Sequence, residues 1–458
     1  MPTVSAALDA PSRERSVSRR AALGGLAALT LINLFNYLDR YVVSALLPSL
    51  GRAHMGLSDF RLGTLMTSFL VVYMLAAPAF GVLGDRASRT KSIAAGVLVW
   101  SFATALSGLA RSYFQLLAGR AVVGIGEAAY GTIAPALLAD YFGPEARGRV
   151  FAVFGMAIPV GAALGYVVGG LIDHAYGWRA AFFVAGLPGV ALAAWILRLP
   201  DPLRGAKERA APVLSGAAPV PNGAACVQSR AASMQAGAAP VQGRAAIGLA
   251  ANLAVYARLL RRRPYTLAVL GYAAYTFALG GLAFWMPTFL ERVRGVPGPA
   301  ATTGFGAIVV ATGFAGTFAG GWLGDRWLKA SREAYYWLCA LTALAAVPFA
   351  AVALTAQAPT VYYAAIVAAE LLLFMSTGPI NSIIVSLAAP WERASAVALS
   401  VLTIHLLGDV ASPPLIGALS DVSSLGAAVL IVPAAIALCG ALWLAAGREA
   451  RSERRAVA

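Results

Sequence analysis

Charged residues, cysteines and histidines are scarce in this chain, and each scarcity removes a class of function. Lysine, arginine, aspartate and glutamate make up only 12% of the 458 residues. Cys226, Cys339 and Cys439 lack the spacing of a disulfide framework or a zinc site, so we expect no redox chemistry and no metal. The three histidines form no HExxH motif, and GxSxG and a cysteine–histidine pair are missing, so we expect neither an enzyme nor a cofactor.

The phosphate-binding sequence GxxxxGK(S/T) is also missing, which argues against ATP as the energy source. Lysine is rare too. Arginine outnumbers it 32 to 3 and alanine is abundant, a composition typical of a GC-rich bacterial genome.

Long apolar segments are what the chain has in abundance. Hydrophobic residues make up 59% of it, and the apolar runs are continuous rather than alternating, which favours helices over a membrane barrel. Each run is long enough for the roughly 20 helical residues that cross a bilayer. We therefore predict an all-α membrane protein with 12 transmembrane helices. The predicted spans are 21–50, 59–83, 92–110, 113–142, 149–173, 178–199, 265–290, 301–324, 334–355, 361–388, 395–419 and 426–446.

Positive charges are distributed unevenly between the two sets of loops. Of the 35 lysines and arginines, 27 lie in one set of loops, which includes both termini and the central loop, 6 lie in the other set and 2 lie within spans. The positive-inside rule therefore places both termini in the cytoplasm, and we expect a bacterial inner-membrane protein. Topology accounts for the net charge of +15, so a nucleic-acid partner has no support. The first run is too long for a signal peptide and should remain as a helix.

The spans fall into two groups of six, separated by a long break. The predicted six-helix bundles are 21–199 and 264–446, with cytoplasmic tails at 1–20 and 447–458. The segment 200–263 contains three copies of AAPV and few large apolar residues, and we interpret its first part as a flexible linker. Its last part has the pattern of an amphipathic helix. Both an interfacial helix on anionic lipid and a solvated basic linker fit that pattern.

The two halves of the chain share short sequence motifs. GVLGDR at 81–86 returns as GWLGDR at 321–326, and PEARGR at 144–149 returns as PWERAS at 390–395. The nearly constant offset indicates a duplicated six-helix unit. Two such halves around a site at the membrane midplane are the plan of many secondary transporters.

Several stretches resemble a known family. The loop GVLGDRASRTKSI (81–93) is similar to the signature loop of the major facilitator superfamily. Four further stretches are similar to the Spinster branch of this superfamily. They are INLFNYLDRYVVSALLP (32–48), GRAVVGIGEAAYGTIAPALLADYF (119–142), GGLAFWMPTFL (280–290) and HLLGDVASPPLIG (405–417). The resemblance implies a monomeric, alternating-access transporter of a lysophospholipid or a sphingosine-1-phosphate-like lipid. A proton-coupled exporter of drugs, organic anions or metabolites remains the alternative, and a receptor would need no repeat.

Four ionisable residues lie inside spans of the first half. At 1.5 Å per residue, Asp39 lies about 16 Å from the outer end of its span, and Arg120 and Glu127 lie about 10 and 20 Å from theirs. Arg120 and Glu127 are two turns apart and share a helix face. Because charges within a membrane are costly, we expect these three residues and Arg40 to form one cluster beside a water-filled cavity.

Such a cluster can hold and release a proton. A carboxylate next to Arg120 stays ionised, whereas a desolvated carboxylate takes up a proton, so movement of Arg120 to a substrate anion would link substrate to proton. The resemblance implies this role for Asp39, Arg120 and Glu127. The alternative is a static ion network that joins the two helices.

Residues around this cluster are candidates for substrate binding. A cation in an otherwise apolar and aromatic cavity suits a lipid with an anionic head, in a protein that membrane lipids surround. The candidates are Arg120, Asn36, Tyr37, Arg40, Tyr130 and Glu370. The role of Glu370 is left open. For His405 and Asp409, one helical turn apart, we favour roles in helix packing.

The loop between the second and third spans predicts a gate. Its glycines permit close helix contact, and its basic residues can reach Asp140 at the inner end of the fourth span. By resemblance, this loop closes the cytoplasmic side in the outward-open state. The gate candidates are Gly81, Asp85, Arg86, Arg89, Asp140, Asp325 and Arg326. Positive-inside topology alone would also explain the arginines, though not Asp85 and Asp325.

Overall fold

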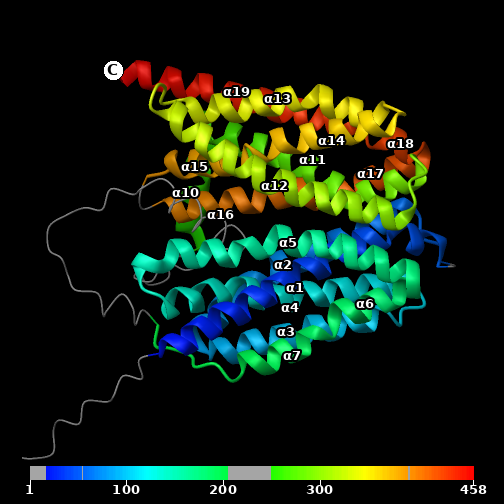
Figure 1. The fold of residues 1–458 in the computed structure, drawn as a ribbon. Coiled ribbons are helices and arrows are strands. Elements are labelled where there is room, and N and C mark those ends of the chain that lie inside the picture. The colour runs from blue at the N-terminus through cyan, green and yellow to red at the C-terminus, as the bar shows by residue number, and fades with distance from the viewer. Residues whose placement is uncertain (1–16, 54, 205–248, 390–391, 458) are drawn as a thin grey trace, which may run out of the picture.

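The computed structural model describes residues 17–53, 55–204, 249–389 and 392–457, and these residues form helices and turns without a strand. Figure 1 shows two bundles of helices side by side. Both ends of the described chain lie at the same end of these bundles (Figure 1). We call this end the terminal face, and the other end the opposite face.

The first bundle is formed by α1 to α7, and serine residues fix the starts of four of its helices. The side chains of Ser18, Ser58, Ser88 and Ser112 each accept a hydrogen bond from a backbone N–H three residues later, which satisfies an otherwise unpaired donor. The helices are α1 (Arg19–Arg52), α2 (Asp59–Arg86), α3 (Arg89–Ser107), α4 (Tyr113–Tyr141), α5 (Pro144–Tyr176), α6 (Trp178–Gly186) and α7 (Pro188–Ile196).

The second bundle follows the linker helix α10 (Leu249–Arg261). Two of its predicted spans are broken, one between α14 and α15 and the other by a π-helix, η1. The elements are α11 (Arg263–Arg292), α12 (Gly298–Leu328), α13 (Ala334–Thr355), α14 (Pro359–Phe374), α15 (Thr377–Ser386), α16 (Arg393–Ile404), η1 (His405–Asp409), α17 (Ser412–Val422), α18 (Leu425–Ala428) and α19 (Ile431–Val457).

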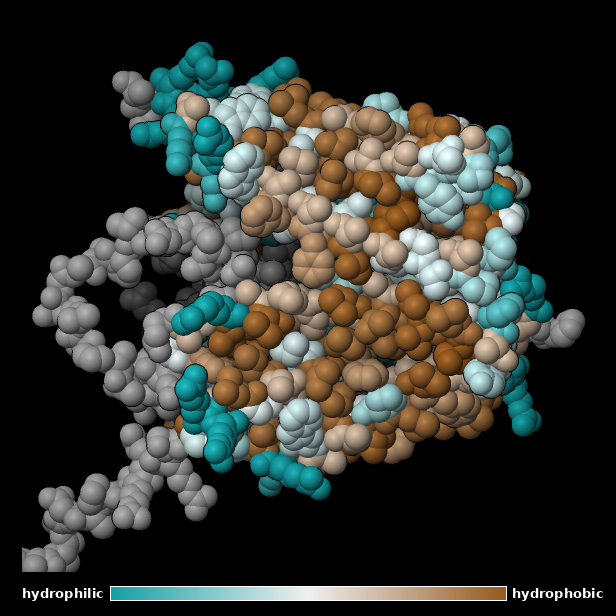
Figure 2. Space-filling view, viewed as in Figure 1, coloured by the Kyte–Doolittle hydropathy of each residue, from teal (hydrophilic) through white to brown (hydrophobic). Residues whose placement is uncertain are grey.

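The predicted all-α membrane fold is confirmed. Among the described residues, 11 helical segments are long and apolar enough to cross a membrane. The 19-residue α3 is not among these 11, and it packs against α4, α6 and α7 within the first bundle, where the sequence predicts a span. Figure 2 shows apolar residues over the middle of the molecule and polar ones gathered toward its two ends, as a bilayer requires.

The bundles meet through α1 with α11, α2 with α17, and α5 with α12. Toward the opposite face, an added Cβ on Gly417 of α17 would overlap the backbone of Asp59 in α2, so these helices are in direct contact. On α5, an added Cβ on Gly170 would overlap Thr302 of α12. Nearer the terminal face, an added Cβ on Gly155 or Gly321 would meet no atom within 4 Å.

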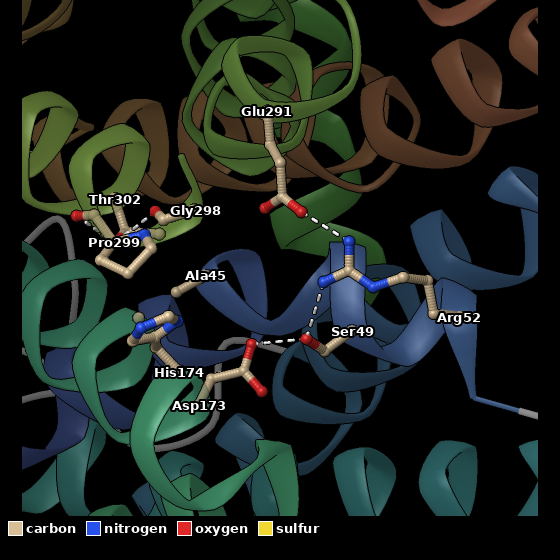
Figure 3. A pocket seen from close by; sticks show the side chains of 10 residues that line it. Ala45, Ser49, Arg52, Asp173, His174, Glu291, Gly298, Pro299 and Thr302 are labelled. Carbon is tan, nitrogen blue, oxygen red and sulfur yellow. Dashed lines mark hydrogen bonds and ion pairs between the residues drawn. The ribbon is translucent and has the colours of Figure 1, made fainter. Parts of the chain in front are cut away.

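Ion pairs reinforce this contact at the opposite face. Arg52 of α1 reaches Glu291 of α11 at 2.6 Å, and Arg292 reaches Asp59 at 2.7 Å. Figure 3 shows Arg52 between Glu291 and Ser49, beside a cavity of about 260 Å³ that both bundles line. The backbone N–H groups of Asp59 and Phe60 also donate to Asp421, at 2.8 and 3.0 Å.

The linker helix α10 packs partly against the second bundle, and its contact with lipid remains a prediction. Leu259 is fully buried, and Val255 and Tyr256 pack against the core of the second bundle, because this bundle offers them a protein surface. Arg258 pairs with Glu392 at 3.1 Å. The AAPV repeats, Cys226 and the first residues of the linker helix lie outside the described residues.

Candidate functional site

Two buried ion pairs join α1 to α4 in the middle of the first bundle. Arg120 donates to Asp39 at 3.2 Å, and Arg40 donates to Glu127 at 2.8 Å. All four residues therefore meet, as the helical spacing predicts, but as two pairs. Glu127 also lies within electrostatic range of Asp39 and Arg120.

The two pairs differ in their access to solvent. The side chains of Arg120 and Asp39 are 2% and 1% exposed, whereas that of Arg40 is 15% exposed and that of Glu127 is fully buried. Arg40 is thus the charged group of this site that water or a ligand can reach. The sequence predicts that Arg120 binds the substrate anion. The difference in exposure favours Arg40 instead.

Phe69 of α2 lies beside both arginines. Its ring centroid lies 4.8 Å from Cζ of Arg40 and 5.2 Å from Cζ of Arg120, so it contacts both guanidinium groups. A ring face attracts a cation, so Phe69 stabilises both charges. Arg40 rests on the ring of Tyr37 as well, at 4.8 Å.

Thr104 of α3 fixes the carboxylate of Asp39. Its hydroxyl donates to Asp39 Oδ1 at 2.8 Å, while Arg120 occupies Oδ2. Both oxygens of Asp39 are therefore satisfied. Among the described residues, each pair leaves two buried polar atoms without a hydrogen bond. They are two nitrogens of Arg120 in the first pair, and Nε of Arg40 and Oε1 of Glu127 in the second. The carboxylate is incompletely bonded only in the second pair, and a buried polar atom without a partner is costly.

The other predicted binding residues are spread more widely. Asn36 is buried on α1, one residue from Tyr37. Tyr130 is buried beside Trp100 and Phe154, and its hydroxyl donates to the carbonyl of Leu29, which favours a packing role.

Glu370 lies in the second bundle, away from the ion pairs. Its carboxylate accepts a hydrogen bond from Thr312 at 2.9 Å and lines an apolar cavity with residues such as Leu282 and Met286. The α1–α4 pairs and Glu370 are therefore separate features of the molecule. His405 and Asp409 pair at 3.0 Å in the π-helix, and both remain partly exposed.

The predicted gate residues differ in burial and in the contacts that they make. Arg89 pairs with the buried Asp140 and, at 2.9 Å, with Asp201. Asp85 and Arg86 are exposed, whereas Gly84 brings α2 against Ile133 of α4. Gly81 is in ordinary contact with Thr132.

The repeat copy of the gate differs from the first. Asp325 accepts a hydrogen bond from Tyr335 at 2.6 Å, and Arg326 is exposed. The start of the linker, however, is bound to the first gate loop. Arg204 donates to the carbonyls of Gly84 and Ala87, and Tyr141 donates to that of Pro200. Sequence reasoning missed these contacts, since Asp201 carries no signal beyond its charge.

Comparison with known proteins places this arrangement in a family. Residues 29–408 match the family model of the Major Facilitator Superfamily. The chain is 33% identical over 423 residues to protein spinster homolog 3 of Danio rerio, an alignment that covers 89% of this chain and 78% of that one. The chain belongs to the Spinster branch of the Major Facilitator Superfamily. This Spinster-family chain is therefore a multi-pass membrane transporter and not an enzyme.

Other relatives of this Spinster-family chain are also similar along most of their length. The sphingosine-1-phosphate transporter SPNS2 of Mus musculus is 33% identical over 459 residues, covering 93% of this chain and 77% of that one. A crystal structure of a bacterial homolog of the human lysosomal transporter Spinster, inward-facing and unoccupied, has the same fold. Its TM-score is 0.78 at 22% identity, with 94% of this chain and 98% of that one covered.

Proposed function

We propose that this Spinster-family protein is a proton-coupled secondary active transporter that moves an amphiphilic, lysophospholipid-like substrate by alternating access. Its place would be a bacterial inner membrane, with both termini in the cytoplasm. The exposure of Arg40 beside the buried Glu127 carries the proposal.

The distribution of charge supports this orientation and the conformation that follows from it. Most lysines and arginines lie with the termini and the linker, so the terminal face would be cytoplasmic. The bundles are joined at the opposite face by Arg52 with Glu291 and Arg292 with Asp59. The described conformation is then closed toward the outside and corresponds to an inward-facing state.

Proton coupling follows from exchange of partners at Arg40. An anionic substrate head that binds the partly exposed Arg40 would withdraw it from Glu127. A buried carboxylate left without its cation is strongly destabilised, so Glu127 would take up a proton as the anion binds. Asp39 would keep its partners throughout, because Arg120 and Thr104 both bond to it and neither is exposed.

The substrate class rests on the relatives and on the chemistry of Arg40. A relative is named as a transporter of sphingosine-1-phosphate, which joins a phosphate head to an apolar tail. The planar guanidinium of arginine suits a phosphate group. Tyr37 and Asn36 lie next to it on α1 and could contact the same head.

Transport in proteoliposomes tests this function. The purified chain would be reconstituted, and uptake of labelled sphingosine-1-phosphate, a lysophospholipid, a lipophilic drug and a small organic anion would be measured with and without an imposed proton gradient. The proposal predicts that the gradient drives accumulation of a lysolipid.

Glu127→Gln places at this position a side chain that cannot take up or release a proton. Gradient-driven uptake should fall at least tenfold, while substrate counterflow continues. Accumulation of the drug or the organic anion alone would favour the alternative exporter. Gradient-driven uptake of lysolipid by Glu127→Gln at the normal rate would contradict the proton assignment.

A further inference from the structure

The last helix of the protein does not end where its bundle ends. Helix α19 runs without a break from Ile431 to Val457, and Figure 1 shows its C-terminal end projecting at the terminal face. Its buried face packs against α11 and α13. The residues of this face recur every three or four positions, and they are Val432, Ile436, Cys439, Trp443, Ala446 and Ala450.

The opposite side of α19 forms a second, equally regular stripe. Successive members are three or four residues apart, so they lie above one another on one helix face. They are Ala434, Ala437, Ala441, Leu444, Arg448, Arg451 and Arg455, each exposed or partly exposed. This face points away from α11 and α13, which makes its first part lipid-facing. The stripe therefore changes from apolar residues to arginines along one continuous helix.

Ion pairs hold the arginine-bearing part of α19 against the bundle. Glu449 pairs with Arg263 at 3.8 Å and Glu453 with Arg262 at 3.6 Å. On another side, Arg454 pairs with Glu333 at 2.6 Å. These contacts use the acidic residues of this segment on the bundle side. Among the described residues, no ion pair compensates the three arginines of the stripe.

We propose that Arg448, Arg451 and Arg455 form a binding surface for the headgroups of anionic phospholipids in the leaflet at the terminal face. We call these three residues the arginine stripe. The exposed Leu438 still belongs to the apolar belt, and Arg448 lies ten residues further along, about 15 Å at the helical rise. This distance is half of the roughly 30 Å hydrocarbon core of a bilayer, so a Leu438 near the midplane would place Arg448 at the headgroups.

Charge and geometry both suit this partner. Figure 2 shows polar residues gathered around the C-terminal end, next to the apolar surface that faces lipid. Arginine binds phosphate through paired N–H groups, and basic residues at the membrane surface attract anionic lipid. Neighbouring members of the stripe are one helical turn apart, so one or two headgroups could contact all three side chains.

The test is lipid selectivity of the full-length protein in detergent. Binding of dioctanoyl phosphatidylglycerol and dioctanoyl phosphatidylcholine would be compared by microscale thermophoresis. The wild-type protein should prefer phosphatidylglycerol, and a variant with Arg448→Gln, Arg451→Gln and Arg455→Gln should lose at least tenfold in affinity for it. Changing the same three residues to lysine should keep most of the binding, which also shows that the segment still folds.

A matched control separates the stripe from net charge. A variant with Lys329→Gln, Arg332→Gln and Arg393→Gln loses the same three charges from exposed positions in the same bundle. It should bind phosphatidylglycerol like the wild type. Equal loss in both glutamine variants, or unchanged binding when the stripe is removed, would overturn the proposal. All variants keep Arg40, so any binding of phosphatidylglycerol at the proposed substrate site is common to them.

Discussion

Arg40 donates to Glu127 across 2.8 Å, and in this pair the arginine reaches solvent whereas the carboxylate does not. A ligand can therefore compete for the cation while the anion stays in a medium of low dielectric constant. The neighbouring Asp39–Arg120 pair lacks this asymmetry, since both side chains are buried. The two pairs are chemically alike, yet their surroundings suit them to different tasks.

Replacing each arginine should separate these tasks. Arg40→Ala should weaken binding of an anionic lysolipid at least tenfold, and its cost in stability should be the smaller of the two because Glu127, left without its cation, takes up a proton. Arg120→Ala leaves Asp39 as an unpaired buried charge and should destabilise the fold by about 3 to 5 kcal/mol. Lysolipid binding and thermal unfolding in detergent would both be measured. Equal effects of the two variants would indicate one structural network.

Thr104 should position Asp39 through a single hydrogen bond. Thr104→Val keeps the shape of the side chain but leaves Asp39 Oδ1 without its donor, at an expected cost of about 1 to 3 kcal/mol in stability. Thr104→Ser keeps the donor and serves as the control. Thermal unfolding of both variants checks this prediction. Equal stabilities of the valine and serine variants would mean that the bond contributes little.

Gly417 should be required for closure at the opposite face. Gly417→Val would place side-chain atoms against the backbone of Asp59 and prevent α2 and α17 from touching. A cysteine at Ser49, in a background without the native cysteines, should then react faster with an impermeant maleimide from that side. Gly321→Val, where an added Cβ has open space, is the control. Similar labelling rates in all three proteins would argue against closure at this contact.

The sequence carried enough information to predict the twelve-span plan. Long apolar runs indicate which segments are helical, and the spacing of polar residues indicates which helix faces are polar. Both patterns arise because lipid surrounds the helices. Asp39, Arg40, Arg120 and Glu127 could be expected to meet because charges in a membrane need partners. Their division into two pairs depends on side-chain directions that helical spacing does not determine.

The features that could not be predicted involve residues without a charge or a regular spacing in the sequence. Phe69 is one apolar residue among many in its span, and Thr104 is only weakly polar, so neither stands out before the helices are packed. The break between α14 and α15 falls at Met375 and Ser376. Neither residue is a proline, so the sequence does not mark this break. The contacts of the linker helix could not be predicted because its apolar face fits protein as well as lipid, and the structure shows Leu259 packed against protein.

Proton uptake on substrate binding tests the central claim most directly. The purified protein would be mixed with sphingosine-1-phosphate in weakly buffered solution containing a pH indicator, with Glu127→Gln measured in parallel. If the anion draws Arg40 from Glu127, the wild type should take up about one proton per bound lipid and the variant none. Lipid binding without proton uptake in the wild type, or equal uptake in both proteins, would contradict the account.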